Sequence, residues 1–206
     1  MSGEDEADIR EACSRGHTAT AVTLLLERYG PELLGYLSAL FRDKRQAREA
    51  YCLLAEDLWR GLPGFEWRCS ARVWAYTLAR HARARYLKAE RRHVAAEQAL
   101  RDLPWLGQLL ERTRSSTPLH LRSEIRNQFR EISGQLSDED QTLIMLRVDR
   151  RLSWRELAVV LGEVEGEPSP AEMARATARL RQRFVTVKEK LRELIEAECL
   201  LKPRDG

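Results

Sequence analysis

The side chains best suited to chemistry in this sequence are arginine and glutamine residues near its C-terminal end. Arg175, Arg179 and Gln182 recur at helical spacing, so a helix would place them on one face, with further cations beside it. Both side-chain types can form paired hydrogen bonds with base edges in the major groove, and lysines there would contact phosphate. The pattern predicts noncovalent reading of duplex DNA. The predicted duplex-binding residues are Arg175, Arg179, Arg181, Gln182, Arg183 and Lys188.

Two helices are expected to present this set. Residues 171–194 carry apolar side chains at alternating spacings of three and four, which predicts an amphipathic helix opened by Ser169 and Pro170. Before it, Ser153 and Glu156 have the spacing of a capping box, so a short helix is expected from residue 154 to 161. The pair predicts a helix-turn-helix with a long turn over residues 163–178. The alternative for the basic helix is a solvated amphipathic surface.

A second candidate set lies earlier, in an aromatic loop followed by a basic helix. Residues 61–70 hold aromatic rings among glycine, proline and polar residues, and Ser70 can cap a helix over 71–92 that is rich in cations. Cations that follow a phosphate backbone, beside aromatic faces that stack on bases, are typical of single-stranded DNA binding. The alternative is that Trp74 is core and the cations are surface. The predicted single-strand set is Phe65, Trp67, Arg72, Tyr76, Arg80, His81, Arg83, Arg85 and Lys88.

Three further helices are expected before this loop. Thr18 or Thr20 can begin a helix that Gly30 and Pro31 end, and the next helix then runs to about residue 41. Asp43 can cap a third helix over 44–60, with Leu58 and Trp59 facing inward. A partner helix could dock on its charged outer face, and a solvated face is the alternative. The docking residues are Arg48, Glu49, Cys52, Glu56 and Asp57.

Composition sets the fold class and the division of the chain. The 206 residues are 43% hydrophobic and 33% charged, with sparse glycine and proline and few β-branched runs. This predicts an all-α protein of two small helical domains joined by a flexible linker. Although the net charge is only +3, acidic residues gather near the beginning and cations over 72–92. The expected parts are an acidic flexible arm (1–18), an N-terminal domain (19–93), a linker (94–120) and a C-terminal helix-turn-helix domain (121–200).

The sequence also argues against several function classes. The four histidines are far apart, and nucleophile-elbow, phosphate-loop and zinc-protease motifs are missing, so we expect a non-enzyme without cofactor. The four cysteines form no C-x-x-C pair, which fits small buried thiols in a reducing cytosol. A zinc site using Cys69 with His81, or Cys13 with His17, is an open alternative to the expected absence of metal. With no long apolar run or signal peptide, a soluble cytoplasmic protein without membrane insertion is expected.

Taken in order, these segments resemble a known family. Residues 27–34, 57–65 and 71–81 are similar to the promoter-melting domain of bacterial RNA polymerase sigma factors of the extracytoplasmic-function (ECF) group. Residues 136–140 and 152–158, followed by Arg183 and residues 188–192, are similar to the C-terminal domain of that group. The resemblance covers about two thirds of the chain. Departures from the family pattern are Ala47-Arg48-Glu49 and Cys52 in the third helix, and His81 and Arg85 in the basic helix.

The resemblance implies a role for each candidate surface. The last helix would read the −35 duplex, the aromatic loop and basic helix would melt and capture the −10 element, and the third helix would bind core RNA polymerase. An anti-sigma factor is a further implied partner. Two alternatives stay open, a helix-turn-helix regulator that binds duplex DNA without polymerase, and a helical scaffold whose charges only solubilise it.

Overall fold

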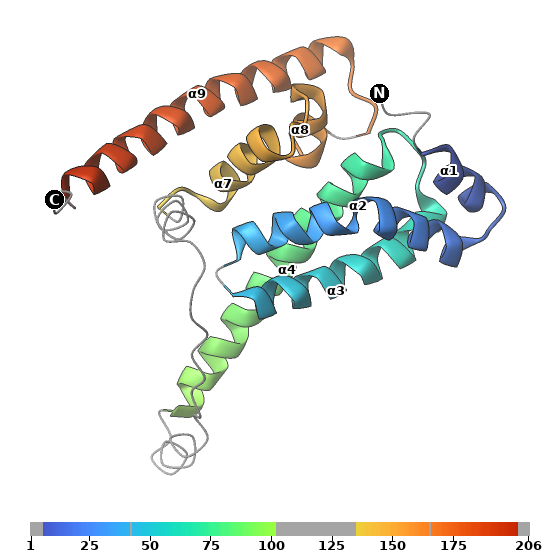
Figure 1. Cartoon of the computed structure of the whole chain (residues 1–206), viewed down its shortest axis with the longest axis horizontal. Helices are drawn as coiled ribbons and strands as arrows, with labels where there is room; N and C mark the ends of the chain where they lie inside the picture. The colour runs from blue at the N-terminus through green and yellow to red at the C-terminus, as the bar shows by residue number, and fades with distance from the viewer. Residues whose placement is uncertain (1–5, 42, 102–134, 165, 202–206) are drawn as a thin grey trace, which may run out of the picture.

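A computed structural model describes residues 6–41, 43–101, 135–164 and 166–201, with side chains to residue 92 in the fourth helix and to 197 in the last (Figure 1). The all-α prediction is confirmed, because every regular element in these ranges is helical. In order, the elements are α1 (Ala7–Ser14), α2 (Thr18–Leu40), α3 (Lys44–Gly61), the 3₁₀ turn η1 (Leu62–Gly64), α4 (Ala71–Arg101), α7 (Asp138–Ile144), the π-helical turn η3 (Met145–Asp149), α8 (Trp154–Val160) and α9 (Pro170–Leu201). Across the described ranges, none of these helices has the length and apolarity to cross a membrane.

The beginning of the chain differs from the expected flexible arm. Residues 7–14 form α1, and its Ile9 and Ala12 are buried against α2. Asp8 accepts two hydrogen bonds from Arg28 at 3.0 and 2.8 Å. The prediction of a flexible arm is therefore wrong for this helix, because its few apolar residues and its acids find partners that lie far along the chain.

A second difference from the sequence prediction is the absence of a helix break at Gly30 and Pro31. α2 runs through Gly30 and Pro31 without ending, so the predicted break there is wrong. Gly30 lies where a Cβ atom would stand 2.7 Å from the Tyr51 hydroxyl of α3, and the absence of a side chain lets the two helices approach. Packing against α3 and α4 outweighs the hydrogen bond that Pro31 removes.

Local signals set the helix beginnings as expected. Asp43 accepts from the Arg45 amide at 2.9 Å, and Ser70 accepts from the Val73 amide at 3.2 Å. Ser137 caps α7 in the same way. α4 continues past the expected end near 92, so residues 94–101 of the predicted linker are helical. The rest of that linker lies outside the described residues, as do residues 121–134 at the start of the predicted C-terminal domain.

The C-terminal part is a helix-turn-helix, as predicted. The capping box of α8 is present, with the Ser153 amide 2.7 Å from the Glu156 carboxylate. Gly162 ends the helix at φ +73°, a conformation that glycine adopts without strain. α9 begins at Pro170, because Ser169 and Glu172 form a second reciprocal cap, and it lies across α7 and α8 (Figure 1).

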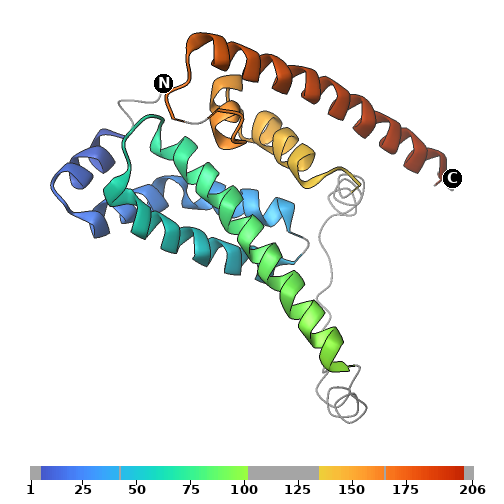
Figure 2. The same ribbon diagram turned by 180° about the vertical axis from the view of Figure 1, so that it is seen from behind.

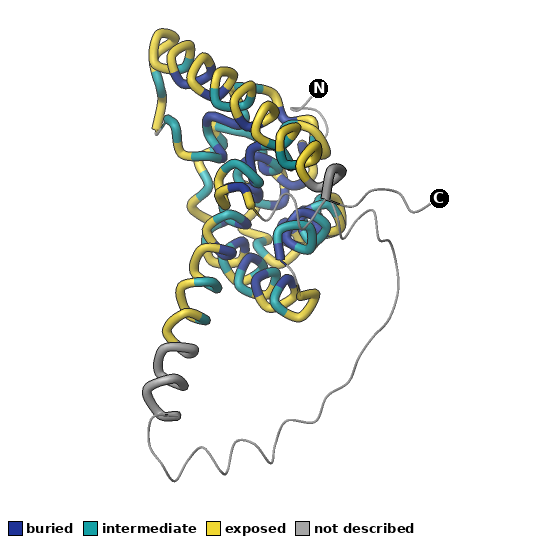
Figure 3. The backbone as a smooth tube through the Cα atoms, turned by 90° about the vertical axis from the view of Figure 1, so that its left-hand side faces the viewer, coloured by how far each residue is buried: buried dark blue, intermediate teal, exposed yellow. Residues whose placement is uncertain are grey.

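Two units can be distinguished, and they pack together. The N-terminal unit comprises α1 to α4, with α4 crossing in front of α2 and α3 in the view of Figure 2. The C-terminal unit comprises α7 to α9, and its α8 contacts α4. A single cluster of buried side chains runs through both units, from Leu37 and Leu54 to Leu146 and Leu157. Buried residues gather where the helices meet, whereas most of residues 84–92 of α4 and 188–197 of α9 are exposed (Figure 3).

Candidate nucleic-acid interface

Three aromatic rings stand together where the loop meets α4. The rings of Phe65 and Trp74 stack at 4.6 Å, and Trp67 lies 4.8 Å from Phe65 at an angle of 47°. η1 and the Ser70 cap position the loop that brings these half-buried side chains together. Trp67 has φ +58°, a left-handed conformation that costs about 1–3 kcal/mol in a residue with a side chain. The loop therefore holds a strained, pre-formed aromatic face of the kind on which bases stack.

The nine residues of the predicted single-strand set divide by exposure. His81, Arg85 and Lys88 are exposed on α4, and Phe65 and Trp67 are half-buried in the loop. The other four residues face the junction with the C-terminal unit. Tyr76 and Arg83 are buried there, and Arg72 and Arg80 are half-buried. The structure thus keeps only part of the predicted set accessible in this arrangement.

Ion pairs and hydrogen bonds hold the second group. Arg72 donates to both Glu32 carboxylate oxygens at 2.7 and 3.0 Å, and to the Arg150 carbonyl of the C-terminal unit at 3.1 Å. The hydrogen bond to Glu32 raises the pKa of Arg72. Arg83 pairs with Asp138 of α7 at 2.9 Å. Two predicted DNA-binding cations therefore connect the units instead of facing solvent.

The same junction contains buried polar atoms without partners. Tyr36 and Tyr76 meet edge to face at 5.5 Å, both fully buried, and burial raises the pKa of each hydroxyl. Four buried atoms find no hydrogen-bond partner among the described residues, namely Tyr76 Oη, Arg80 Nε, Arg83 Nε and Arg150 Nε, whereas the Tyr36 hydroxyl faces Thr142. An unsatisfied buried polar group costs about 1–3 kcal/mol. The contact between the units therefore combines apolar burial with a substantial polar cost.

His81 and Arg85 occupy the opposite side of α4. Burial, and then the charge of Arg80, lower the pKa of His81, whose Nε2 lies 3.3 Å from the Arg80 guanidinium. Arg85 pairs with Asp57 of α3. This ion pair joins α3 to α4. The Asp57 carboxylate therefore helps to hold the two helices together, in addition to its place on the predicted docking face.

α9 keeps most of the predicted duplex-binding set in solvent. Arg175, Arg179, Gln182 and Thr186 are exposed along one face, as their spacing predicts. Arg179 pairs with Glu163 of the turn at 2.9 Å, an exposed pair of small energetic weight. Across α9, the flanking Arg181 and Lys188 are also exposed. This face can approach a phosphate backbone and base edges without rearrangement of the helix.

Arg183 has different surroundings from the rest of that set. It contacts Asp140 at 2.7 Å and Glu139 at 3.0 Å, both on α7. Burial acts to lower the pKa of Arg183, and the hydrogen bonds to the two acids outweigh it, so the net pKa is raised. Arg183 therefore ties α9 to α7 inside the C-terminal unit, and the structure gives it a structural task besides the predicted reading of bases.

Trp154 begins α8 and organises the cations around it. Its ring meets Phe184 of α9 edge to face at 5.5 Å, and the guanidinium of Arg147 lies over it at 4.7 Å. Arg181 approaches the same ring at 5.9 Å. Cation–π contacts of this kind are worth about 0.5–1 kcal/mol at exposed sites. They fix the direction of Arg181 relative to the duplex-facing side of α9.

The predicted docking face of α3 is exposed and ends at a tryptophan. Arg48, Glu49, Cys52 and Glu56 are exposed, so the expectation of buried thiols is wrong for Cys52. Trp59, expected to face inward, is 52% exposed, because Leu54 and Leu58 already fill the contact with α2 and α4. Tryptophan is enriched among the residues that contribute most to protein–protein binding, so Trp59 is a candidate contact on this face.

Two functional candidates, Glu6 just before α1 and Arg10 within it, were not predicted. The Glu6 side chain accepts hydrogen bonds from the first amides of α4, and the Arg10 guanidinium lies 4.8 Å from the Trp67 ring. Only acidic charge marked this segment in the sequence. Periodicity could not reveal a contact between residues about sixty positions apart.

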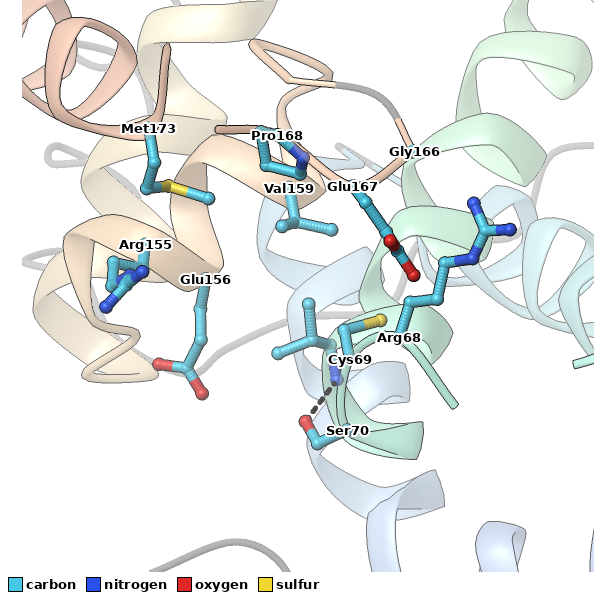
Figure 4. Close-up of a pocket in the computed structure, with 11 residues that line it drawn as sticks. Arg68, Cys69, Ser70, Arg155, Glu156, Val159, Gly166, Glu167, Pro168 and Met173 are labelled. Atoms are coloured by element: carbon cyan, nitrogen blue, oxygen red, sulfur yellow. Dashed lines mark hydrogen bonds between the residues drawn. The ribbon is translucent and has the colours of Figure 1, made fainter. Parts of the chain in front are cut away.

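A pocket of about 520 Å³ separates the aromatic loop from the turn of the helix-turn-helix. Arg68 and Cys69 line it from the N-terminal unit, facing Glu167 and Met173 of the C-terminal unit (Figure 4). Burial raises the pKa of Cys69. Across the described residues no cluster of three or more histidine, cysteine or acidic side chains could hold a metal ion.

Proteins similar to this chain are found among the bacterial sigma factors. The chain is 29% identical over 150 residues to the RNA polymerase sigma factor YlaC of Bacillus subtilis, a match that spans 67% of this chain and 78% of that protein. Its fold is similar to that of the sigma factor RpoE in a complex with the anti-sigma factor NepR from Bartonella quintana. The two share a TM-score of 0.60 at 15% identity, over 83% of this chain and 94% of that one. No family model matches the sequence.

Proposed function

We propose that this chain, which belongs with the sigma factors of bacterial RNA polymerase in the ECF group, directs core polymerase to promoters by reading a −35 duplex and capturing a melted −10 element. It acts as a non-catalytic DNA-binding initiation factor. Three surfaces carry the proposal, the exposed face of α9, the aromatic loop with the accessible part of α4, and the outer face of α3.

α9 is the −35 reader in this proposal. Arg179 and Gln182 lie on its exposed face, and Arg175 begins the same face one turn earlier. Paired hydrogen bonds from such side chains to guanine or adenine are worth about 1–3 kcal/mol of discrimination each. Arg181 and Lys188 supply phosphate contacts, whose contribution falls as salt rises.

The aromatic loop captures the −10 element. Phe65, Trp67 and Trp74 form a face on which an unstacked base gains about 1–3 kcal/mol. This gain offsets part of the cost of opening the duplex. His81, Arg85 and Lys88 lie exposed along α4 and would follow the displaced strand. The pre-formed aromatic face is the observation that favours a melting factor over a simple duplex reader.

The outer face of α3 docks on core polymerase. Its charges pair along the helix, Arg45 with Glu49 and Arg60 with Glu56, so the exposed Trp59 is the main apolar contact it offers. Arg48 makes no ion pair among the described residues and is available to a partner acid.

Use of the whole predicted single-strand set, including Arg72 and Arg83, requires the units to separate. In the structure the C-terminal unit covers Arg72 and Arg83, and α8 rests on α4. The polar cost at the junction lowers the free energy that polymerase and promoter must supply for opening. A helical anti-sigma factor is a further partner in this proposal, and it would act by holding the units away from the polymerase-bound arrangement.

Run-off transcription with purified core polymerase tests the proposal. Polymerase plus this chain should give transcripts of defined length from at least one promoter of the source genome, and polymerase alone should give none. Trp59→Ala is compared with the wild type, because it removes the exposed ring of the proposed docking face and leaves the core intact. This variant should give less transcript than the wild type. Tight duplex binding without any transcript would instead support a helix-turn-helix regulator, the reading favoured by the exposure of α9 alone.

A further inference from the structure

The start of α4 is capped from the opposite end of the N-terminal unit. Glu6 is only 5% exposed, and its carboxylate accepts from the Ala71 amide at 2.7 Å and the Arg72 amide at 3.0 Å. Ser70 accepts from the Val73 amide at 3.2 Å. The first amides of a helix have no partner within it, and here three of them are satisfied, two by a residue more than sixty positions away.

The carboxylate is itself fixed in place. The Tyr29 hydroxyl donates to Glu6 at 2.8 Å, and burial together with this hydrogen bond raises the pKa of Tyr29. Ile9 is fully buried one turn later, and Asp8 holds Arg28. α1 is therefore attached at several points to α2 and at one point to α4.

The exposed side of α1 reaches the aromatic loop. The Arg10 guanidinium lies over the Trp67 ring at 4.8 Å, and Phe65 contacts the same ring at 4.8 Å. Trp67 is also the loop residue with left-handed backbone at φ +58°. Such a conformation persists only where several neighbours hold it, and Arg10 and Phe65 are the neighbours with ring contacts to Trp67 among the described residues.

We propose that Glu6 and Arg10 are positioning residues for base capture, which make α1 part of the −10 interface. Glu6 sets where α4 begins relative to the loop, and Arg10 holds the Trp67 ring against Phe65. The aromatic face is then formed before DNA arrives, so less ordering is needed on binding. The inference rests on the proposed function, because the ring matters only if it meets an unstacked base.

The first experiment measures the loop without DNA. Amide hydrogen exchange of residues 62–74 is compared in the full-length wild type, Glu6→Ala, Arg10→Ala and the control Arg15→Ala. Arg15 is exposed on the turn after α1, and its ion pair among the described residues is with Glu11 of α1. Exchange should quicken in the first two variants and stay unchanged in the control. Unchanged exchange in both α1 variants would overturn the proposal.

The second experiment measures binding of a labelled mixed-sequence single strand of twelve nucleotides, and of its duplex, over a salt series. Arg10→Ala should weaken single-strand binding about two- to fivefold, the scale of one exposed cation–π contact, with duplex affinity unchanged. Arg10→Lys should restore part of the loss. If Arg10→Ala weakened binding of the single strand and of the duplex equally, α1 would have only a structural role, and the proposal would be overturned.

The salt series separates positioning from direct contact. If Arg10 instead binds phosphate, Arg10→Ala lowers the salt slope by about one while exchange in the loop is unchanged, and the positioning role is overturned. Failure of the wild type to bind any single strand would contradict base capture in the proposed function. The exchange experiment would still decide whether α1 holds the loop.

Discussion

The two basic helices of this chain hold similar numbers of cations in opposite surroundings. Arg175 and Gln182 of α9, which we propose contact the duplex, lie in solvent, whereas Arg72 and Arg83 of α4 connect to the C-terminal unit. Charge density along a helix therefore predicts where cations gather and not which of them are accessible. In this arrangement α9 is ready to meet DNA, and the covered side of α4 is not.

Tyr76 gives the largest expected effect, because it separates core from binding surface. Tyr76→Ala should lower the free energy of unfolding by about 3–5 kcal/mol, the usual cost of removing a buried aromatic ring. Lys88→Ala, on the exposed side of the same helix, should change it by less than about 0.5 kcal/mol. Urea denaturation monitored by circular dichroism measures both.

Tyr76→Phe provides the matched control for that pair. It keeps the ring and removes a hydroxyl that has no partner, so stability should be unchanged or higher. A loss above about 1 kcal/mol in Tyr76→Phe would show that the hydroxyl is bonded and that the junction carries less polar cost than we infer.

The Arg83–Asp138 pair tests what holds the units together. Asp138→Ala leaves the buried Arg83 without its carboxylate and should loosen the junction, with an increase in the radius of gyration by X-ray scattering. Because Asp138 is itself about half exposed, the free energy of unfolding should fall by about 1–3 kcal/mol, less than on breaking a fully buried pair. Glu139→Ala is the control, since Glu139 pairs with Arg183 inside the C-terminal unit. Equal expansion in both variants would contradict this role of Asp138.

Gln182 and Arg183 test the division within α9. Gln182→Ala should weaken binding to a −35 duplex by about 1–3 kcal/mol without changing stability, because its side chain is exposed. Arg183→Ala should lower the stability of the C-terminal unit as well, because it leaves Asp140 and Glu139 unpaired. Unchanged unfolding in Arg183→Ala would return Arg183 to the group of pure DNA contacts.

His81 gives the smallest expected effect. Its folded-state pKa is lowered, so the folded state resists the proton that the unfolded state binds, and stability falls slightly as pH drops from 7.5 toward 5.5. Urea midpoints at the two pH values should show less of this dependence in His81→Gln than in wild type. An identical pH dependence in the variant would assign the effect to other groups.

Local signals in the sequence were enough to predict much of the fold. Asp43, Ser70 and Ser153 cap helices as expected, and Ser137 caps α7 in the same way, because each cap joins residues two or three positions apart. The exposed reading face of α9 also follows from spacing alone.

Contacts across long sequence distances could not be predicted in this way. The burial of Glu6 depends on the amides of α4, and the continuity of α2 through Pro31 depends on packing against α3 and α4. The inward expectation for Trp59 failed because smaller leucines already fill that contact. Charge patterns likewise could not show that Arg72 and Arg83 would bridge two units.

Separation of the N-terminal and C-terminal units on binding to polymerase and promoter DNA is the central requirement of the proposed function. Spin labels on Glu27→Cys of α2 and Lys190→Cys of α9, both exposed positions, would report the distance between the units in a chain whose native cysteines are serine. We predict one short, narrow distance in the free chain and a clearly longer one with core polymerase and promoter DNA. The same short distance in a transcribing complex would contradict the account.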